Sequence, residues 1–161
     1  MKTIFLSILL AFSAATKAQV IKVSLQASGL TCSMCSNAIN RALKTLDFIN
    51  RVDADIKTYT FEIYFKPTSS VDFDLIKRKV ENAGFSVSRF VVTMLIDTVH
   101  VLNDHPVTVA GQTFLFTGIK ERSLSGVQEI KILDKGFISA REFKYNAFPV
   151  SAAGSYNASI L

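Results

Sequence analysis

The chain has 161 residues, of which 49% are hydrophobic, and its thirteen phenylalanines supply ample material for a core. Eighteen basic and thirteen acidic residues give a formal net charge of +5 at pH 7. This charge is too mild to indicate a nucleic-acid partner, and a helix would spread the longest basic run, Lys77-Arg78-Lys79, over most of its circumference. Composition therefore predicts a globular protein and argues against nucleic-acid binding.

Residues 1–18 have the pattern of a secretory signal peptide. A charged start at Lys2 leads into an apolar stretch of about a dozen residues, and small residues precede a cleavage site that we place before Gln19. A membrane anchor is the alternative, but the apolar run is shorter than the ~20 residues that span a bilayer. We expect a periplasmic or secreted protein with no membrane anchor after cleavage. About 140 residues then remain, enough for one good core or two small ones.

One strand-like pattern and one helix-like pattern begin the mature chain. Residues 20–27 alternate apolar and polar side chains, which predicts a half-buried strand. Residues 33–46 then predict an amphipathic helix. Its apolar stripe comprises Ala38, Ile39, Ala42, Leu43 and Leu46.

A hairpin and a second helix follow. The first strand of the hairpin carries Val52, Ala54 and Ile56, and the second carries Tyr59, Phe61, Ile63 and Phe65, with Lys57-Thr58 between them. Asp72 is expected to cap a helix that ends at Gly84. The apolar residues of that helix are Phe73, Ile76, Val80 and Ala83. Residues 85–96 return to strand character.

The order of these elements predicts an α+β fold. Strand, helix, strand, strand, helix, strand is the ferredoxin-like arrangement, with a four-stranded antiparallel sheet and both helices on one face. We assign this domain to residues 19–96.

Cys32 and Cys35 are the two cysteines of the chain and lie at the entrance of the first predicted helix. Two thiols at this spacing can clamp a soft metal ion or close into a redox-active disulfide. Both chemistries need thiolate, which the exposed N–H groups of a helix start favour. A third possibility is an inert disulfide, because paired cysteines of exported proteins are usually oxidised to disulfides. The loop that it would close is so short, however, that the disulfide would add little stability.

The residues around the cysteines resemble the heavy-metal-associated domain. The likeness covers residues 19–96 and rests on Gly29-x-Thr31-Cys32-x-x-Cys35 before the Ala38-Ile39 helix, together with Glu81-Asn82-Ala83-Gly84-Phe85. This module occurs in copper chaperones, in the soluble domains of metal-pumping ATPases and in periplasmic mercury-binding proteins. Two departures are Leu30, where the family usually has Met, and Asp47-Phe48-Ile49, where it tends to have Pro-Gly-Val.

The resemblance implies a function in metal carriage or buffering, without catalysis. Cys32 and Cys35 would be the metal ligands, and Phe85 would pack close to the metal loop. The partner would be a metal donor or acceptor with its own thiol pair, including a metal-pumping ATPase.

The thiolate pair favours Cu(I), with Hg(II) and Cd(II) also suited by their softness. Zn(II) would need further donors, because structural zinc sites normally have four protein ligands. Relatives that select zinc often have an acidic residue where this chain has Thr31. The alternative function is a periplasmic thiol-disulfide oxidoreductase using the same CxxC, but no aromatic residue precedes Cys32.

Three further side chains are candidate metal donors. Met34 lies between the thiols and is expected to point into solvent. His100 and His105 are expected to be surface residues, unless the turn that carries His105 folds against the cysteine loop.

Residues 97–146 predict a small β module packed on the first domain. Five short strands are indicated, around Val99 and Val101, Val107 and Val109, Phe114 and Phe116, Ile130 and Ile132, and residues 137–143, with residues 123–126 as a separating turn. Fifty residues of strands cannot easily bury a core alone, so the module is expected to extend the sheet of the first domain. Residues 147–161 are predicted to be a C-terminal tail. No hydrolytic motif can be found in the chain.

Overall fold

The computed structural model describes residues 18–161 apart from 32, 68, 147, 150 and 153. The predicted signal peptide, except for Ala18, lies outside the described residues. In chain order the helices and strands are β1 (Gln19–Ser28), α1 (Ser33–Leu43), β2 (Ile49–Asp55), β3 (Thr60–Phe65), α2 (Phe73–Asn82), β4 (Ser86–Val101), β5 (Pro106–Val109), β6 (Gln112–Phe116), β7 (Arg122–Ile132), α3 (Ala140–Asn146) and β8 (Ser155–Ile160).

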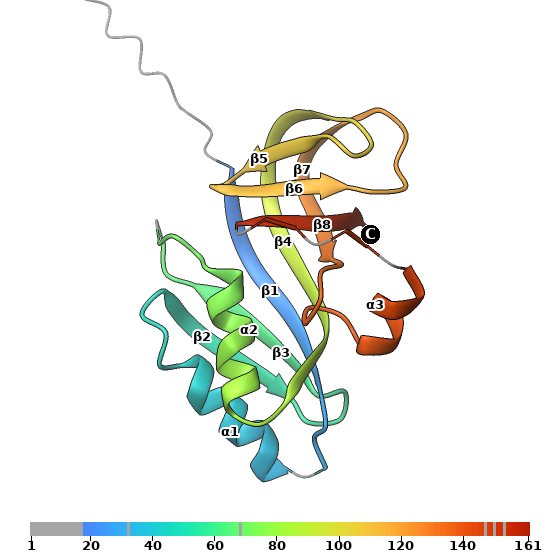
Figure 1. Cartoon of the computed structure of the whole chain (residues 1–161). Coiled ribbons are helices and arrows are strands. Elements are labelled where there is room, and N and C mark those ends of the chain that lie inside the picture. The colour runs from blue at the N-terminus through green and yellow to red at the C-terminus, as the bar shows by residue number, and fades with distance from the viewer. Residues whose placement is uncertain (1–17, 32, 68, 147, 150, 153) are drawn as a thin grey trace, which may run out of the picture.

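The described strands form one eight-stranded sheet in the order β2-β3-β1-β4-β7-β8-β6-β5. β6 and β8 run parallel, and the other neighbours are antiparallel. α1 and α2 lie on one face of the β2-β3-β1-β4 part (Figure 1). None of the helices within the described residues is long and apolar enough to cross a membrane.

The first half of the chain has the predicted ferredoxin-like arrangement. β1 alternates as expected from Val23 to Ala27, with Val23 and Leu25 fully buried between β3 and β4. The prediction is wrong for Ile21, which is exposed, because the register shift between Val20 and Lys22 puts Val20 on the buried face instead. Asp72 caps α2, because its carboxylate accepts a hydrogen bond from the backbone N–H of Leu75 at 2.8 Å. Gly84 follows the end of α2 at φ +89°, a left-handed conformation that glycine adopts at little cost.

Two details of the first half differ from the prediction. α1 ends at Leu43 and not at Leu46, because the backbone tightens into i→i+3 hydrogen bonds such as Leu46 N–H to Leu43 O at 3.0 Å. Within the helix, Ala38 is exposed. Ala54 and Ile56 are exposed as well, because β2 is an edge strand of the sheet and Ile56 already belongs to the turn that follows it.

β4 is longer than predicted. It was expected to end at Ile96, but it continues to Val101 and pairs with β7 across a register shift between Ile96 and Val99. β7 likewise begins at Arg122, so residues 123–126 belong to a strand and do not form the predicted turn. One strand therefore crosses the position at which the sequence divides the chain into modules.

The C-terminal module is not all-β, and its last residues are not a tail. Residues 137–143 were predicted to be a strand, but Phe137 lies in a turn and α3 begins at Ala140. Residues 155–160 form β8, which is inserted between β7 and β6. The chain end is thus an interior strand, with Tyr156 and Ala158 buried.

A cluster of aromatic rings joins the two halves of the molecule. The Phe73 ring of α2 lies 5.6 Å from Phe90 of β4 and 5.5 Å from Tyr156 of β8, measured between centroids. Phe137 packs edge-on against both Phe90 and Tyr156, at 5.0 and 5.6 Å. Phe114 lies 6.2 Å from Tyr156. The core is therefore continuous from the helices to the C-terminal strands.

Candidate metal site at the start of α1

The turn between β1 and α1 is built around a glycine. Gly29 has φ +87°, which a side-chain-bearing residue would adopt only with strain. Leu30 is buried beside it, at 7% exposure, and anchors the turn to the core. Leu30 thus occupies the buried place expected of the residue that stands where the family usually has Met.

Cys35 lies in the first turn of α1, where it is half-buried and packs against the core. Cys32, the other predicted ligand, lies outside the described residues. Met34 is 80% exposed, in agreement with its interpretation as a solvent-facing residue.

Phe85, which follows the end of α2, lies next to the same turn. Gly84 N–H donates to Glu81 O at 2.9 Å and Phe85 N–H to Val80 O at 3.2 Å, which ends α2 and directs the chain toward the loop. The Phe85 Cδ1 atom lies 4.0 Å from the position that a Cβ atom on Gly29 would take. Phe85 is therefore adjacent to the turn, as expected.

The two histidines do not approach this turn. Ser28 pairs with Ser86 beside the turn, and Gln19 pairs with Leu95 at the opposite end of β1. His100 lies further along β4 still, at roughly 45 Å of strand length from Ser86. The histidines instead make local contacts: His100 Nδ1 lies 3.1 Å from the hydroxyl of Ser123, and His105 Nδ1 lies 3.0 Å from the carbonyl oxygen of Asn103.

Among the described residues, no group of three or more His, Cys, Asp or Glu side chains could hold a metal ion. The part of the chain that the structure describes therefore places the Cys35 sulfur at the entrance of α1 without a cluster of nitrogen and oxygen donors around it.

Sequence reasoning did not single out Ser36, which directly follows Cys35. Its side chain is buried at 3% exposure, and its hydroxyl has no hydrogen-bond partner among the described residues. The signal was its spacing, because Ser36 precedes Ile39 and Leu43 by three and seven positions and so lies on the buried stripe of α1.

Residues 24–86 match the family model of the heavy-metal-associated domain. The resemblance noted in the sequence is therefore confirmed over residues 24–86. The match contains both cysteines, the Gly29 turn and Phe85.

Two curated relatives are similar to this chain over the same part. A probable copper-exporting P-type ATPase of Archaeoglobus fulgidus is 32% identical over 75 residues, which cover 47% of this chain and 9% of that protein. A probable copper-transporting ATPase of Arabidopsis thaliana is 36% identical over 63 residues, or 39% of this chain and 6% of that protein. The chain thus spans less than a tenth of the length of these relatives.

Among solved structures, the yeast copper transporter domain Ccc2a is 33% identical to this chain. The alignment covers 40% of this chain and 86% of that domain, with a TM-score of 0.37. The CopZ metallochaperone is 21% identical, with a TM-score of 0.38 and coverage of 41% and 97%.

Proposed function

We propose that this chain binds a soft metal ion through the thiolates of Cys32 and Cys35 and carries or buffers it. The observation that carries the proposal is the match of residues 24–86 to the heavy-metal-associated domain, because that range contains both cysteines. The half-buried place of Cys35 in the first turn of α1 supports it, since the N–H groups there favour a thiolate.

Cu(I) is the favoured ion. Two thiolates suffice for Cu(I), whereas Zn(II) would need further donors, and the described residues offer no cluster of them. Both curated relatives carry copper in their names. Hg(II) and Cd(II) share the softness that suits the pair, so they belong in the test.

The ion would be handed to or taken from a protein with its own thiol pair, such as a metal-pumping ATPase. A two-coordinate ion on a surface turn can accept a third sulfur from a partner without unfolding of either protein. If the chain is exported and its signal peptide is cleaved before Gln19, this exchange would take place in the periplasm or outside the cell. The oxidising surroundings make the redox state of the two thiols part of the mechanism.

The test is a competitive titration of Cu(I), Zn(II), Cd(II) and Hg(II) on the reduced chain, with its thiols counted beforehand. We expect one equivalent of Cu(I) to bind and this binding to be lost in the Cys32→Ser/Cys35→Ser double variant. Met34→Ala is the matched control and should retain binding, because that side chain is 80% exposed. Equal Cu(I) affinity of the chain and of the double variant would contradict the proposal.

A second assay separates carriage from the enzymatic alternative. The chain is given insulin and a reductant, and its disulfide-reducing activity and reduction potential are measured. We expect no turnover above that of the double variant. Catalytic reduction of insulin by a chain that binds no Cu(I) would establish the oxidoreductase instead.

A further inference from the structure

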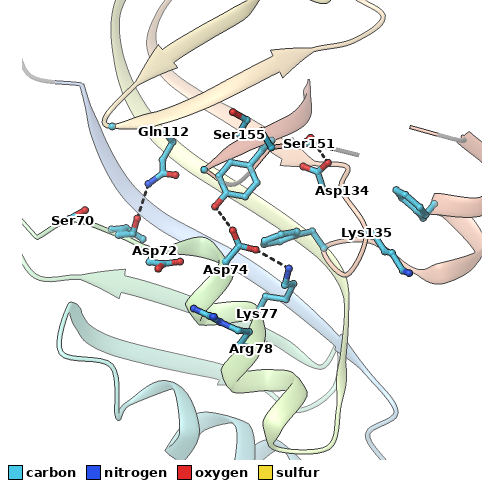
Figure 2. A pocket seen from close by; sticks show the side chains of 17 residues that line it. Ser70, Asp72, Asp74, Lys77, Arg78, Gln112, Asp134, Lys135, Ser151 and Ser155 are labelled. Atoms are coloured by element: carbon cyan, nitrogen blue, oxygen red, sulfur yellow. Dashed lines mark hydrogen bonds and ion pairs between the residues drawn. The ribbon is translucent and has the colours of Figure 1, made fainter. Parts of the chain in front are cut away.

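A groove lies between α2 and the C-terminal strands (Figure 2). Its volume is about 730 Å³, which is in the range of small-molecule sites. Asp74, Lys77 and Arg78 of α2 and residues 70–72 before it form one wall, and β8 and the segment after β7 contribute to the facing wall. The Gly29 turn adjoins the other end of α2, so the two sites are separate. We call this feature the seam groove.

Asp74 of α2 is held inside the seam groove by donors from both walls. Its Oδ1 atom accepts a hydrogen bond from Lys77 Nζ at 2.8 Å, and its Oδ2 atom accepts one from the Tyr156 hydroxyl at 2.9 Å. Burial acts to raise the pKa of Asp74, but the hydrogen bonds from Lys77 and Tyr156 outweigh it and the pKa lies below its ordinary value. Asp74 is therefore a carboxylate.

Asp134 is the second half-buried carboxyl group of the groove. It accepts hydrogen bonds from the Ser151 hydroxyl at 2.7 Å and from the backbone and side-chain nitrogens of Asn157 at 2.9 and 2.8 Å. It makes no ion pair with any described residue. Burial raises its pKa, and the negative charge of Asp74 acts in the same direction. Asp134 is thus a carboxyl group that lacks a cation.

The rim of the seam groove has the opposite balance. Arg78 and Lys135 line it, are exposed, and make no ion pair with a described residue. The third charged residue of the rim, Asp72, is occupied as the cap of α2. The formal charge is therefore negative inside, where two carboxyl groups face the single ammonium of Lys77, and positive at the rim.

We propose that the seam groove binds a zwitterion, an α-amino acid or a short peptide, with its ammonium group toward Asp74 and Asp134 and its carboxylate toward Arg78 and Lys135. Tyr156, Phe137 and Phe143 supply aromatic walls for the apolar part of the ligand. An amine alone would leave the rim cations unpaired, and an organic acid alone would bring its charge toward the inner carboxyl groups. Only the zwitterion complements both layers of charge.

Three matched probes test this on the whole chain without metal: phenylalanine, 2-phenylethylamine, which lacks the carboxylate, and 3-phenylpropionate, which lacks the ammonium. Affinities are measured by calorimetry, and amide shifts in NMR spectra locate the site. We expect phenylalanine to bind best, with 2-phenylethylamine weaker by roughly threefold, the size of an exposed ion pair. We expect 3-phenylpropionate to be roughly tenfold weaker, because charge-assisted contacts to half-buried groups are stronger.

Variants at the rim distinguish specific pairing from general charge. Arg78→Gln with Lys135→Gln should weaken phenylalanine roughly threefold and leave 2-phenylethylamine unchanged, because the amine has no carboxylate for the rim. Arg141→Gln, an exposed residue of α3 that does not line the groove, is the control and should change neither affinity. Equal binding of the three probes, shifts confined to other parts of the chain, or equal losses for amine and amino acid in the double variant would each overturn the proposal.

Discussion

The two ends of the sheet bury their apolar faces in different ways. The β2-β3-β1-β4 part is covered by α1 and α2, which contribute fully buried residues such as Ile39 and Ile76. The C-terminal part has a helix of its own, α3, but that helix buries none of its residues. Its strands instead contact α2 and the segment before it: the Tyr156 hydroxyl of β8 donates to Asp74 of α2 at 2.9 Å, and Gln112 Nε2 of β6 donates to Val71 O at 2.8 Å. The C-terminal part therefore depends on the first part for its core.

The largest expected effect follows from removing β8. A chain that stops after Gly154 loses the strand between β7 and β6, and with it Tyr156 from the aromatic cluster. Since a domain of this size is stabilised by about 5–15 kcal/mol, we expect the truncated chain to lose its cooperative unfolding transition. Urea titration followed by circular dichroism measures this.

Removal of Leu161 alone is the control for the truncation, because that side chain is exposed. It should leave the transition nearly unchanged. If the longer truncation kept a transition with the original midpoint, the first part of the sheet would be stable without the C-terminal strands, and the dependence inferred from the aromatic cluster would be wrong.

Capping and periodicity sufficed for the first part of the fold because those signals are local. Asp72 and Gly84 were placed correctly as the bounds of α2, since a cap depends on residues within one turn. The Gly29 turn and Phe85 followed from the family resemblance.

The C-terminal part carries local signals as well, but they compete with one another. Tyr156, Ala158 and Ile160 alternate with polar residues, the pattern of a half-buried strand, although small residues around them suggested a tail. Ser139 and Glu142 have the spacing of a capping box, and the Glu142 N–H donates to the Ser139 hydroxyl at 3.1 Å.

The position of β8 between two earlier strands could not be deduced from the chain, because strand order depends on contacts between distant residues. The seam groove could not be predicted from the sequence for the same reason. Asp74 and Tyr156 are 82 positions apart, and no spacing rule connects them.

Single substitutions in the core compare the stability of the two parts directly, and each should have a smaller effect than the truncation. Phe73 belongs to α2 and Phe116 to β6, and both are fully buried. We expect Phe73→Ala and Phe116→Ala each to lower the free energy of unfolding by about 3–5 kcal/mol. Because the core is continuous, both should shift a single transition, seen alike by calorimetry and by fluorescence. A second transition in either variant would show that the parts unfold independently.

The hydrogen bond between Tyr156 and Asp74 measures the coupling across the seam. Tyr156→Phe and Asp74→Asn, alone and combined, form a double-mutant cycle in urea. We expect a coupling energy of about 1–2 kcal/mol, toward the low end for a hydrogen bond to a charged group, because Asp74 is partly exposed. The cycle of Tyr156→Phe with Asp53→Asn, an exposed acid on β2, should give no coupling.

The same contact should appear in the pH dependence of stability. The pKa of Asp74 is lower in the folded chain than its ordinary value of 3.8, so the unfolded chain binds the proton more tightly. Its stabilisation is present above the ordinary pKa value and is lost as the pH falls from that value through the lower pKa of the folded chain. The stability difference between the chain and Asp74→Asn should therefore shrink below about pH 4. Asp134, whose pKa is raised, acts with the opposite sign: its contribution falls as the pH rises above its ordinary value. A difference that stays constant from neutral pH to about pH 3 would contradict this assignment.

The smallest expected effect comes from the Asp72 cap, a contact within α2 that is compared with the Tyr156–Asp74 contact across the seam. Asp72 caps α2 through the N–H of Leu75 and makes no hydrogen bond to the described residues of the C-terminal strands. Asp72→Ala should therefore lower the free energy of unfolding by about 1 kcal/mol, the usual contribution of a helix cap. Asp47→Ala, an exposed acid outside α2, is the control and should be nearly neutral. Because the cap is local, its loss should add to that of Tyr156→Phe within about 0.5 kcal/mol. A larger coupling energy between Asp72→Ala and Tyr156→Phe in urea would mean that the C-terminal strands also stabilise the start of α2. The start of α2 would then belong energetically to the C-terminal part.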